Sequence, residues 1–221
     1  MRGVFVTGTD TGSGKTVLAA SICAALAARG ERVAAFKPVV TGLDEEHGEW
    51  PPDHALLAGV TGQTAQEVAP RIFGPAVSPH LAAELAAEAI EPRELVGAAR
   101  RAGAHASALV CEGVGGLLVP LAATYSVRDF AVELGLPVVI AARPGLGTIN
   151  HTLLTVEAAR AAGLSVRAVV MTPWPDEPSQ MERSNRDTVR ALGGVEVCGL
   201  PVATPDGLAD AGATLPLERW L

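Results

Sequence analysis

The sequence predicts an α/β fold in which a parallel sheet is covered by helices on both faces, and three observations indicate it. Short apolar, β-prone runs alternate with longer Ala-rich stretches of helical spacing, as in successive βαβ units. The β-prone runs are apolar at nearly every position, which suits strands buried on both faces. Aromatic residues make up 4% of the chain against 48% hydrophobic residues, so the core must be built mainly from Ala, Val and Leu.

The predicted elements follow one another along the whole chain. The apolar β-prone runs predict strands at residues 3–7, 32–37, 108–111, 137–141, 166–171 and, more weakly patterned, 196–200. The Ala-rich stretches between them predict helices at residues 15–28, 79–87, 92–102, 126–134, 148–162 and 178–192. This order predicts a parallel sheet, because each strand is followed by a segment long enough to cross over it.

Two polar, Pro-containing segments, residues 41–52 and 66–78, interrupt the alternation and are predicted as long loops. Ligands of open α/β sheets bind beyond the carboxyl ends of the strands, so loops at those ends are where we expect a site. The chain has 221 residues and no internal linker, and it is predicted to be a single domain spanning residues 1–221.

Charge and cysteine usage narrow the function classes. The net charge of −7 and the pI of about 5.2 disfavour binding to nucleic acid or to an anionic membrane, so small molecules are the expected ligands. The first residues run into an apolar strand pattern without the features of a leader, so we expect a cytoplasmic protein. Cys23, Cys111 and Cys198 lie in apolar segments and are interpreted as core residues in a reducing compartment, a metal site being the alternative.

The strongest motif is a small-residue loop between the first strand and the first helix, Gly8-Thr9-Asp10-Thr11-Gly12-Ser13-Gly14-Lys15-Thr16. It is a variant P-loop, with one residue more than the common spacing between its first glycine and the Gly-Lys pair. Small residues let backbone N–H groups point at phosphates, and the helix N-terminus adds partial positive charge. Lys15 is expected at the β and γ phosphates and the Thr16 hydroxyl at Mg²⁺; the alternative is a Gly-rich turn without a ligand. The sheet is therefore predicted to be of the P-loop NTPase type.

Lysine usage points to a second functional cation. Of 17 basic residues only Lys15 and Lys37 are lysines, and both fall in motif-like loops. A compact ammonium approaches an oxygen cluster that a planar guanidinium does not fit, although survival by chance under codon bias is an alternative. Lys37 ends the second predicted strand before Pro38 and should point to the binding edge, unless it is a plain surface lysine. A cation there suits a reaction that builds negative charge on a phosphoryl group or an acceptor carboxylate.

Two carboxylates are candidates to complete a magnesium site, because Mg²⁺ held by a hydroxyl and phosphates usually recruits one or two carboxylates. Glu112 ends the third predicted strand and is followed by a Gly-rich run that gives close access. Asp53 precedes a short helical pattern. The alternatives are a solvated turn residue for Glu112 and a helix N-cap for Asp53.

Four motifs then follow in order along most of the chain: Gly8-Thr9-Asp10-Thr11 with Gly14-Lys15-Thr16, Lys37-Pro38-Val39 with Thr41-Gly42, Glu112-Gly113 with Gly115-Gly116, and Gly147-Thr148-Ile149-Asn150-His151. At this spacing they closely resemble the dethiobiotin synthase family. The resemblance implies a homodimer with a parallel sheet of about seven strands. It also implies an ATP-dependent ligase that converts 7,8-diaminopelargonate and CO₂ to dethiobiotin, ADP and phosphate through a carbamate and a carbamic-phosphoric anhydride, the penultimate step of biotin biosynthesis.

The resemblance assigns roles to individual residues. It implies Mg²⁺ at Thr16, Asp53 and Glu112, and catalytic roles for Lys37, Lys15 and Thr11. It implies diamine binding by Lys37, Thr41, Gly147 and Asn150, the last two on a loop whose backbone donors serve the partner subunit's site. The nucleotide-binding residues that it implies are Gly12, Ser13, Gly14, Lys15, Thr16, Val17, Asp53, Glu112, Gly113, Val114, Gly115, Thr172 and Pro201.

One departure from the family pattern concerns the base of the nucleotide. Many members carry an Asn after the fifth strand that reads adenine, whereas this chain has Met171-Thr172-Pro173-Trp174-Pro175. ATP is the expected nucleotide, and another nucleoside triphosphate is the alternative. Trp174 either packs in its loop or stacks on a base.

The first alternative function is a partitioning-type P-loop switch ATPase, whose extra lysine near the start of the P-loop has no counterpart here. The second is another P-loop amide ligase, such as the synthetase domains of cobalamin assembly, which are usually longer chains.

Overall fold

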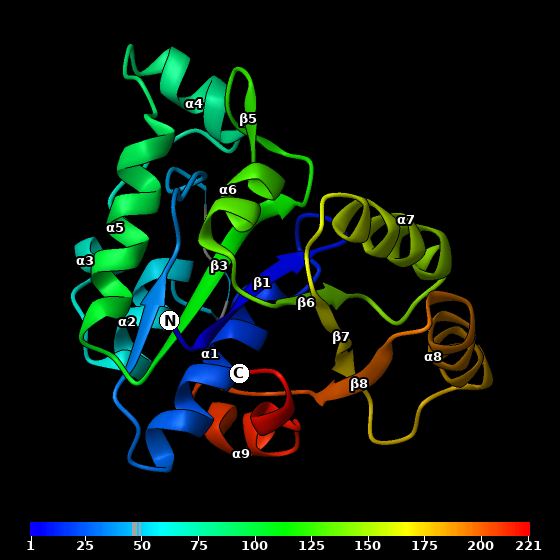
Figure 1. The fold of residues 1–221 in the computed structure, drawn as a ribbon. Coiled ribbons are helices and arrows are strands. Elements are labelled where there is room, and N and C mark those ends of the chain that lie inside the picture. Colours follow the sequence, from blue (N-terminus) through cyan, green and yellow to red (C-terminus); the bar gives the residue numbers. More distant parts are fainter. Residues whose placement is uncertain (46–47, 49) are drawn as a thin grey trace.

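The computed structural model describes residues 1–45, 48 and 50–221, and its centre is a six-stranded parallel sheet (Figure 1). The strands are β1 (Gly3–Gly8), β2 (Val33–Phe36), β3 (Ala108–Gly116), β6 (Val138–Ala142), β7 (Val166–Trp174) and β8 (Glu196–Pro201), and their spatial order is β2-β3-β1-β6-β7-β8. All six predicted strands are present, and the α/β fold is confirmed. The sheet is one strand smaller than the approximate number that the family resemblance implies; beyond β2 the described chain makes an isolated parallel bridge between Val40 and Ile72.

A small second sheet was not predicted from the sequence. It is the antiparallel pair of β4 (Pro120–Ala122) and β5 (Tyr125–Ser126), which follows β3 directly. Ser126 at its end is also the N-cap of the next helix, where its hydroxyl accepts from the Asp129 N–H and the Asp129 carboxylate accepts from the Ser126 N–H. This capping box explains why the helix begins one residue later than predicted.

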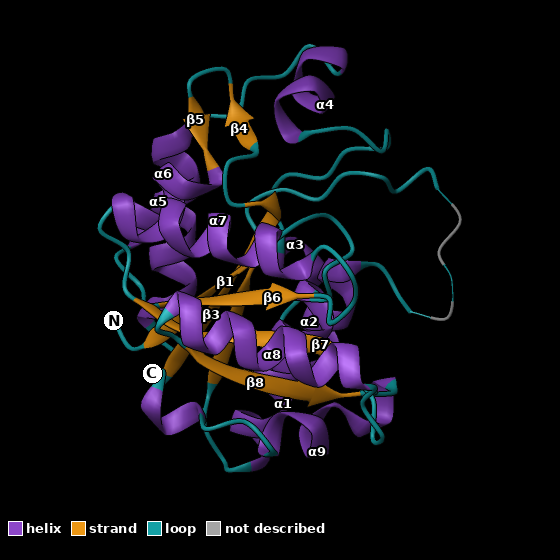
Figure 2. Ribbon diagram, turned by 90° about the vertical axis from the view of Figure 1, so that its right-hand side faces the viewer, coloured by secondary structure: helices purple, strands orange, loops and turns teal. Residues whose placement is uncertain are grey.

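Helices cover both faces of the sheet (Figure 2). They are α1 (Lys15–Ala28), α2 (Asp53–Thr61), α3 (Ala65–Val68), α4 (Pro79–Leu85), α5 (Pro92–Ala104), α6 (Val127–Leu134), α7 (Thr148–Ala161), α8 (Gln180–Gly193) and α9 (Leu208–Ala213), with short 3₁₀ turns at Pro205–Gly207 and Leu217–Arg219. The six predicted helices are confirmed to within two residues at each end. The loop predicted at 66–78 is wrong for residues 66–68, because the Thr64–Glu67 capping box starts α3 there. Residues 46, 47 and 49 of the loop predicted at 41–52 lie outside the described residues.

Two apolar layers hold the helices to the sheet. The layer on one face contains Phe5, Phe36 and Phe130 and receives buried residues from α5, α6, α7 and α8. The layer on the other face is built from Ala, Leu and Ile residues of α1, together with residues of α2 and α9 and with Trp220. The described part of the chain contains no helix that is both long and apolar enough to span a membrane.

The topology brings three functional segments to one edge of the sheet. β1 lies between β3 and β6, so the loop after β1 leaves the sheet centre, and the ends of β2 and β3 lie beside it. The predicted end of the third strand is wrong, because β3 continues past Glu112 to Gly116. Glu112 pairs in register with Val6 and is fully buried. Gly113, which follows Glu112 in the strand, has no room for a side chain, because an added Cβ would come within 2.8 Å of Val127.

Candidate active site

The phosphate loop connects β1 to α1 as predicted. Gly12 and Gly14 have φ of 70° and 84°, a backbone conformation that glycine adopts without strain. Gly14 precedes α1 as its N-cap, and no acidic residue lies in the first turn of that helix to compete with an anion for the backbone N–H groups. A side chain on Gly14 would come within 2.5 Å of Thr172 Cγ2, so the loop packs directly against β7. The turn is therefore shaped as a phosphate site at the N-terminus of a long helix.

Lys15 is the first residue of α1 and is buried, with 7% exposure. Its Nζ donates to the Asp10 carbonyl at 2.9 Å, which folds the side chain back over the loop. Burial, together with repulsion from Lys37, lowers the pKa of Lys15 to about 8. The structure therefore holds this ammonium in a position where an added anion would stabilise its charge.

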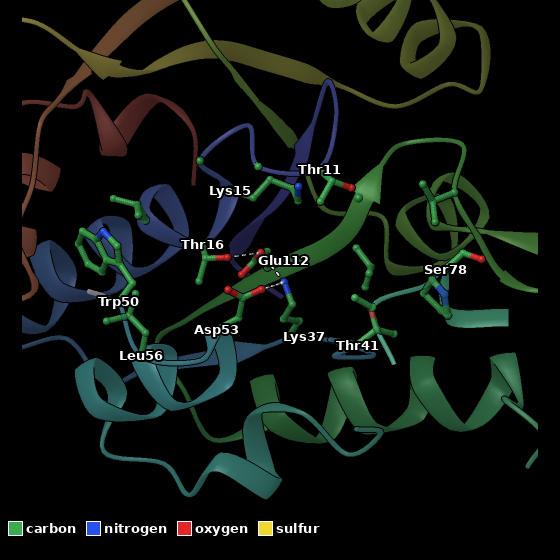
Figure 3. A pocket seen from close by; sticks show the side chains of 18 of the residues that line it. Thr11, Lys15, Thr16, Lys37, Thr41, Trp50, Asp53, Leu56, Ser78 and Glu112 are labelled. Atoms are coloured by element: carbon green, nitrogen blue, oxygen red, sulfur yellow. Dashed lines mark hydrogen bonds and ion pairs between the residues drawn. The ribbon is translucent and has the colours of Figure 1, made fainter. Parts of the chain in front are cut away.

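A second cation, Lys37, lies directly after β2 with its ammonium between two carboxylates (Figure 3). Its Nζ is 2.5 Å from Glu112 Oε1 and 2.9 Å from Asp53 Oδ2. The Thr16 hydroxyl donates to the same Glu112 oxygen at 2.8 Å. Four side chains from α1, β3, α2 and the end of β2 thus converge at one point, which contradicts the surface-lysine alternative for Lys37.

Burial and charge act in opposite directions within this cluster. Burial alone would lower the pKa of Lys37, but Asp53 and Glu112 outweigh it and raise that pKa, so the ammonium persists. Burial would raise the pKa of Asp53, but Lys37 and the nearby Thr16 hydroxyl hold it below its usual range. For the fully buried Glu112, burial raises the pKa even though Lys37 opposes it. Glu112 Oε2 is buried and has no hydrogen-bond partner among the described residues.

These groups line one cavity of about 650 Å³. It contains twelve of the residues predicted from the sequence: Thr11, Gly12, Gly14, Lys15, Thr16, Val17, Lys37, Thr41, Asp53, Glu112, Val114 and Gly115. It also contains residues that the sequence analysis missed, which are Trp50, Pro51, Leu56, Ala76, Val77, Ser78, Pro79 and Val119. Four of these, Trp50, Pro51, Ala76 and Val77, are apolar residues of the two long loops and show no chemical signal in the sequence. The clue to them was the predicted position of the loops over the sheet edge.

Six predicted site residues lie outside this cavity. Ser13 is buried and lines a separate pocket of about 170 Å³ beside Arg143, and Gly113 packs against Val127. Thr172 packs against Gly14, and Pro201 ends β8. Gly147 and Asn150 are exposed at the start of α7.

Trp174 is the last residue of β7, beyond the predicted strand end at residue 171, and its side chain packs against the neighbouring strand β8. It lies close to Gly199, and the Arg186 guanidinium stands 5.2 Å from its ring centroid.

Comparisons with known proteins agree with this geometry. A family model described as an AAA domain matches residues 2–202. The chain is 34% identical to "ATP-dependent dethiobiotin synthetase BioD" of Bacillus subtilis (strain 168), over 90% of this chain and 87% of that protein. Proteins of the same name match at 43% identity in Anaeromyxobacter dehalogenans (strain 2CP-1), over 81% of each chain, and at 37% in Mycobacterium sp. (strain KMS), over 100% and 98%.

Among solved structures, the fold resembles cell division protein FtsY from Thermotoga maritima, with a TM-score of 0.50 and 10% identity over 96% of this chain and 68% of that chain. At that identity the likeness concerns the fold alone and supports a P-loop type of sheet. The sequence relatives are closer and cover nearly the full length. The chain therefore belongs to the family of ATP-dependent dethiobiotin synthetases.

Proposed function

We propose that this protein uses Mg-ATP to join CO₂ to 7,8-diaminopelargonate and close the cyclic urea of dethiobiotin. The observation that carries the proposal is the placement of Lys37 against Glu112 and Asp53 in the same cavity as the P-loop lysine Lys15. Two ammonium groups in one partly closed cavity favour reactions in which negative charge builds up between them. A carbamate that accepts a phosphoryl group builds up such charge.

The side chains divide the electrostatic work. Lys15 neutralises the phosphates of the nucleotide, and the N-terminus of α1 adds partial positive charge at the same point. Lys37 keeps its proton because its pKa is raised, so it acts as a fixed cation for the carbamate. Thr41 and Thr11 supply hydroxyls on either side of the cavity for the amine groups. Attack of the second amine on the mixed anhydride then closes the ring and releases phosphate.

The residues at the cluster fit a bound Mg²⁺. Thr16, Asp53 and Glu112 offer one hydroxyl and two carboxylates, and the unpartnered Oε2 of Glu112 is a buried oxygen that a cation would satisfy. No group of three or more His, Cys, Asp and Glu side chains suited to a metal occurs among the described residues, which agrees with an ion that takes its remaining ligands from phosphates and water. When bound, Mg²⁺ neutralises the β and γ phosphate oxygens.

We also infer a homodimer, with each substrate site completed by the partner subunit. Leu146, Leu154 and Leu118 are 94%, 56% and 59% exposed, and the last two border a cavity of about 430 Å³ at α7. Exposed leucines gathered near one helix are typical of an association surface. Gly147 and Asn150 lie at the start of this helix, outside the Lys37 cavity of their own chain. Residues that donate hydrogen bonds to the substrate of a partner subunit would lie in such a position.

The experiment that tests the function measures phosphate release from Mg-ATP and bicarbonate, with and without 7,8-diaminopelargonate, together with mass detection of dethiobiotin. We expect release to depend on the diamine and to match the product formed. Lys37→Ala should keep nucleotide binding and lose turnover, whereas Glu112→Gln should shift the Mg²⁺ titration to higher concentrations. Diamine-independent release without a new product would support the switch ATPase, an alternative that the synthetase relatives do not favour.

A further inference from the structure

The carboxylation step requires a proton acceptor, and the groups of the Lys37 cluster do not provide one. An alkyl ammonium must lose a proton before its nitrogen lone pair can form a bond to CO₂. The titratable side chains that line the cavity, within the described residues, are Lys15, Lys37, Asp53 and Glu112. Lys37 holds its proton, and Asp53 is a weakened base paired with Lys37. Glu112 Oε1 already accepts two hydrogen bonds, and its Oε2 is the oxygen assigned above to a cation. Lys15 is assigned above to the phosphates of the nucleotide.

A hydroxyl–imidazole pair lies on the Thr41 side of the same cavity. Ser78 lines the cavity wall, and its Oγ is 3.0 Å from His80 Nδ1. In Figure 3 Ser78 lies on the same side of Lys37 as Thr41, away from Trp50 and Leu56. A substrate that reaches from the Lys37 cluster past Thr41 therefore passes this hydroxyl.

Ser78 is at a position where a serine usually caps a helix. It is the N-cap of α4, and its backbone is extended with φ −62° and ψ 150°. A serine there normally accepts from a backbone N–H of the first turn, yet Ser78 makes no side-chain cap hydrogen bond. Its hydroxyl is directed to the imidazole instead. Histidine is the side chain type that most often exchanges protons near neutral pH, and a Ser–His hydrogen bond can pass a proton between them.

We propose that Ser78 and His80 form the proton relay that deprotonates the substrate amine for carboxylation. The ammonium N–H proton passes to Ser78 Oγ while the Ser78 O–H proton passes to His80 Nδ1, which leaves a neutral amine and an imidazolium. The amine lone pair then forms the N–C bond to CO₂, and the imidazolium returns its proton to solvent. This inference rests on the proposed function, because it names the base for that reaction.

The surroundings of His80 permit this role. Helix α4 packs against β4, which carries no titratable side chain, and Tyr125 lies on the paired strand β5. On α4 itself, Glu84 lies one turn after His80 and is exposed. The imidazole is partly buried, so it contacts the cavity wall through Ser78 and remains open to proton exchange with solvent.

The test compares pH profiles of kcat/KM for the diamine at saturating Mg-ATP in wild type, His80→Gln, Ser78→Ala and Ser78→Thr. We expect His80→Gln and Ser78→Ala to lose on the order of a hundredfold near pH 7, the lower end of the usual contribution of a general base. The deficit should shrink as pH rises, because a growing fraction of the diamine is already deprotonated in solution. Ser78→Thr keeps the hydroxyl and should retain most of the activity, and added imidazole should partly rescue His80→Gln.

Two controls separate the relay from a structural role. His105→Gln changes an exposed histidine at the end of α5 and should leave the profile unchanged. Mg-ATP affinity and the melting temperature should be unchanged in His80→Gln. A deficit that is constant across pH and not rescued by imidazole would overturn the relay while leaving the proposed function intact. A wild-type protein that makes no dethiobiotin would overturn the proposed function and the relay with it.

Discussion

Replacing Lys37 by Met should destabilise the protein strongly, because it removes the partner of a fully buried carboxylate. Glu112 is 0% exposed and Lys37 is 3% exposed, with 2.5 Å between Nζ and Oε1. Breaking such a buried pair costs about 3–5 kcal/mol, since the remaining charge is left uncompensated. The Lys37–Asp53 contact adds little to this cost, because the Asp53 side chain is 44% exposed.

The expected change in melting temperature follows from the size of the domain. A loss of 1 kcal/mol lowers the melting temperature by about 2–4 °C in a chain of this length, so Lys37→Met should melt about 6–20 °C below wild type at pH 8. The assay is thermal unfolding followed by circular dichroism, in chelator to prevent a bound cation from replacing the lysine. Arg93→Met changes an exposed arginine on α5 and should shift the melting temperature by no more than about 2 °C.

The pH dependence distinguishes this mechanism from a simple loss of packing. Without Lys37, burial leaves Glu112 with a folded-state pKa above its unfolded value, so its contribution to stability is present below the unfolded pKa and lost as pH rises through the folded pKa. The deficit of Lys37→Met should therefore be larger at pH 8 than at pH 5, and adding Glu112→Gln should recover part of it at pH 8. A deficit that is equal at both pH values, or unchanged by Glu112→Gln, would refute the reasoning.

Three further predictions concern the nucleotide and the surface. Burial and Lys37 lower the pKa of Lys15 to about 8, and phosphates favour its charged form. ATP binding should therefore be accompanied by proton uptake above pH 8, and the affinity should fall by about tenfold per pH unit there. Calorimetry that shows no proton uptake at pH 9 would contradict this. Gly14→Ala should abolish ATP binding in a titration, because Gly14 has φ 84° and the new Cβ would lie 2.5 Å from a β7 side chain. The control Gly30→Ala, at φ 81° in open space, should bind ATP normally. Equal affinities of the two variants would count against the steric argument. Leu154→Glu should convert the proposed dimer to a monomer in light scattering, while Leu192→Glu, at a still more exposed site on α8, should not. A wild-type monomer would remove the dimer proposal.

Local patterns were sufficient to predict most of the fold. Residues 15–28 form a helix with the predicted bounds, because the Ala-rich segment starts at a glycine-rich loop and its apolar residues are buried against the sheet. The β4–β5 pair and α9 were missed because strands of two or three residues and a six-residue helix are too short to show a period. They are stabilised by the elements on which they pack, as α9 is by α1.

The candidate site also contains residues that local sequence patterns predict and residues that they do not. Lys15 and Thr16 could be predicted because a phosphate loop is contiguous in sequence, and its chemistry requires particular residues at fixed spacing. Trp50 and Ser78 could not be predicted individually, because they reach the cavity through the course of two long loops. Leu56 could not be predicted because it is an apolar residue of the short helix α2.

Sequence alone was enough to predict the fold class and the phosphate loop and to single out Lys15 and Lys37, since each of these depends on neighbouring residues or on composition. The tertiary structure alone decided that Lys37, Asp53, Glu112 and Thr16 meet at one point, although 96 residues separate Thr16 from Glu112. It also decided that Ser78 faces His80 instead of capping its helix. Contacts of this kind depend on which strands lie side by side and how the loops fold over them, and no local pattern specifies either.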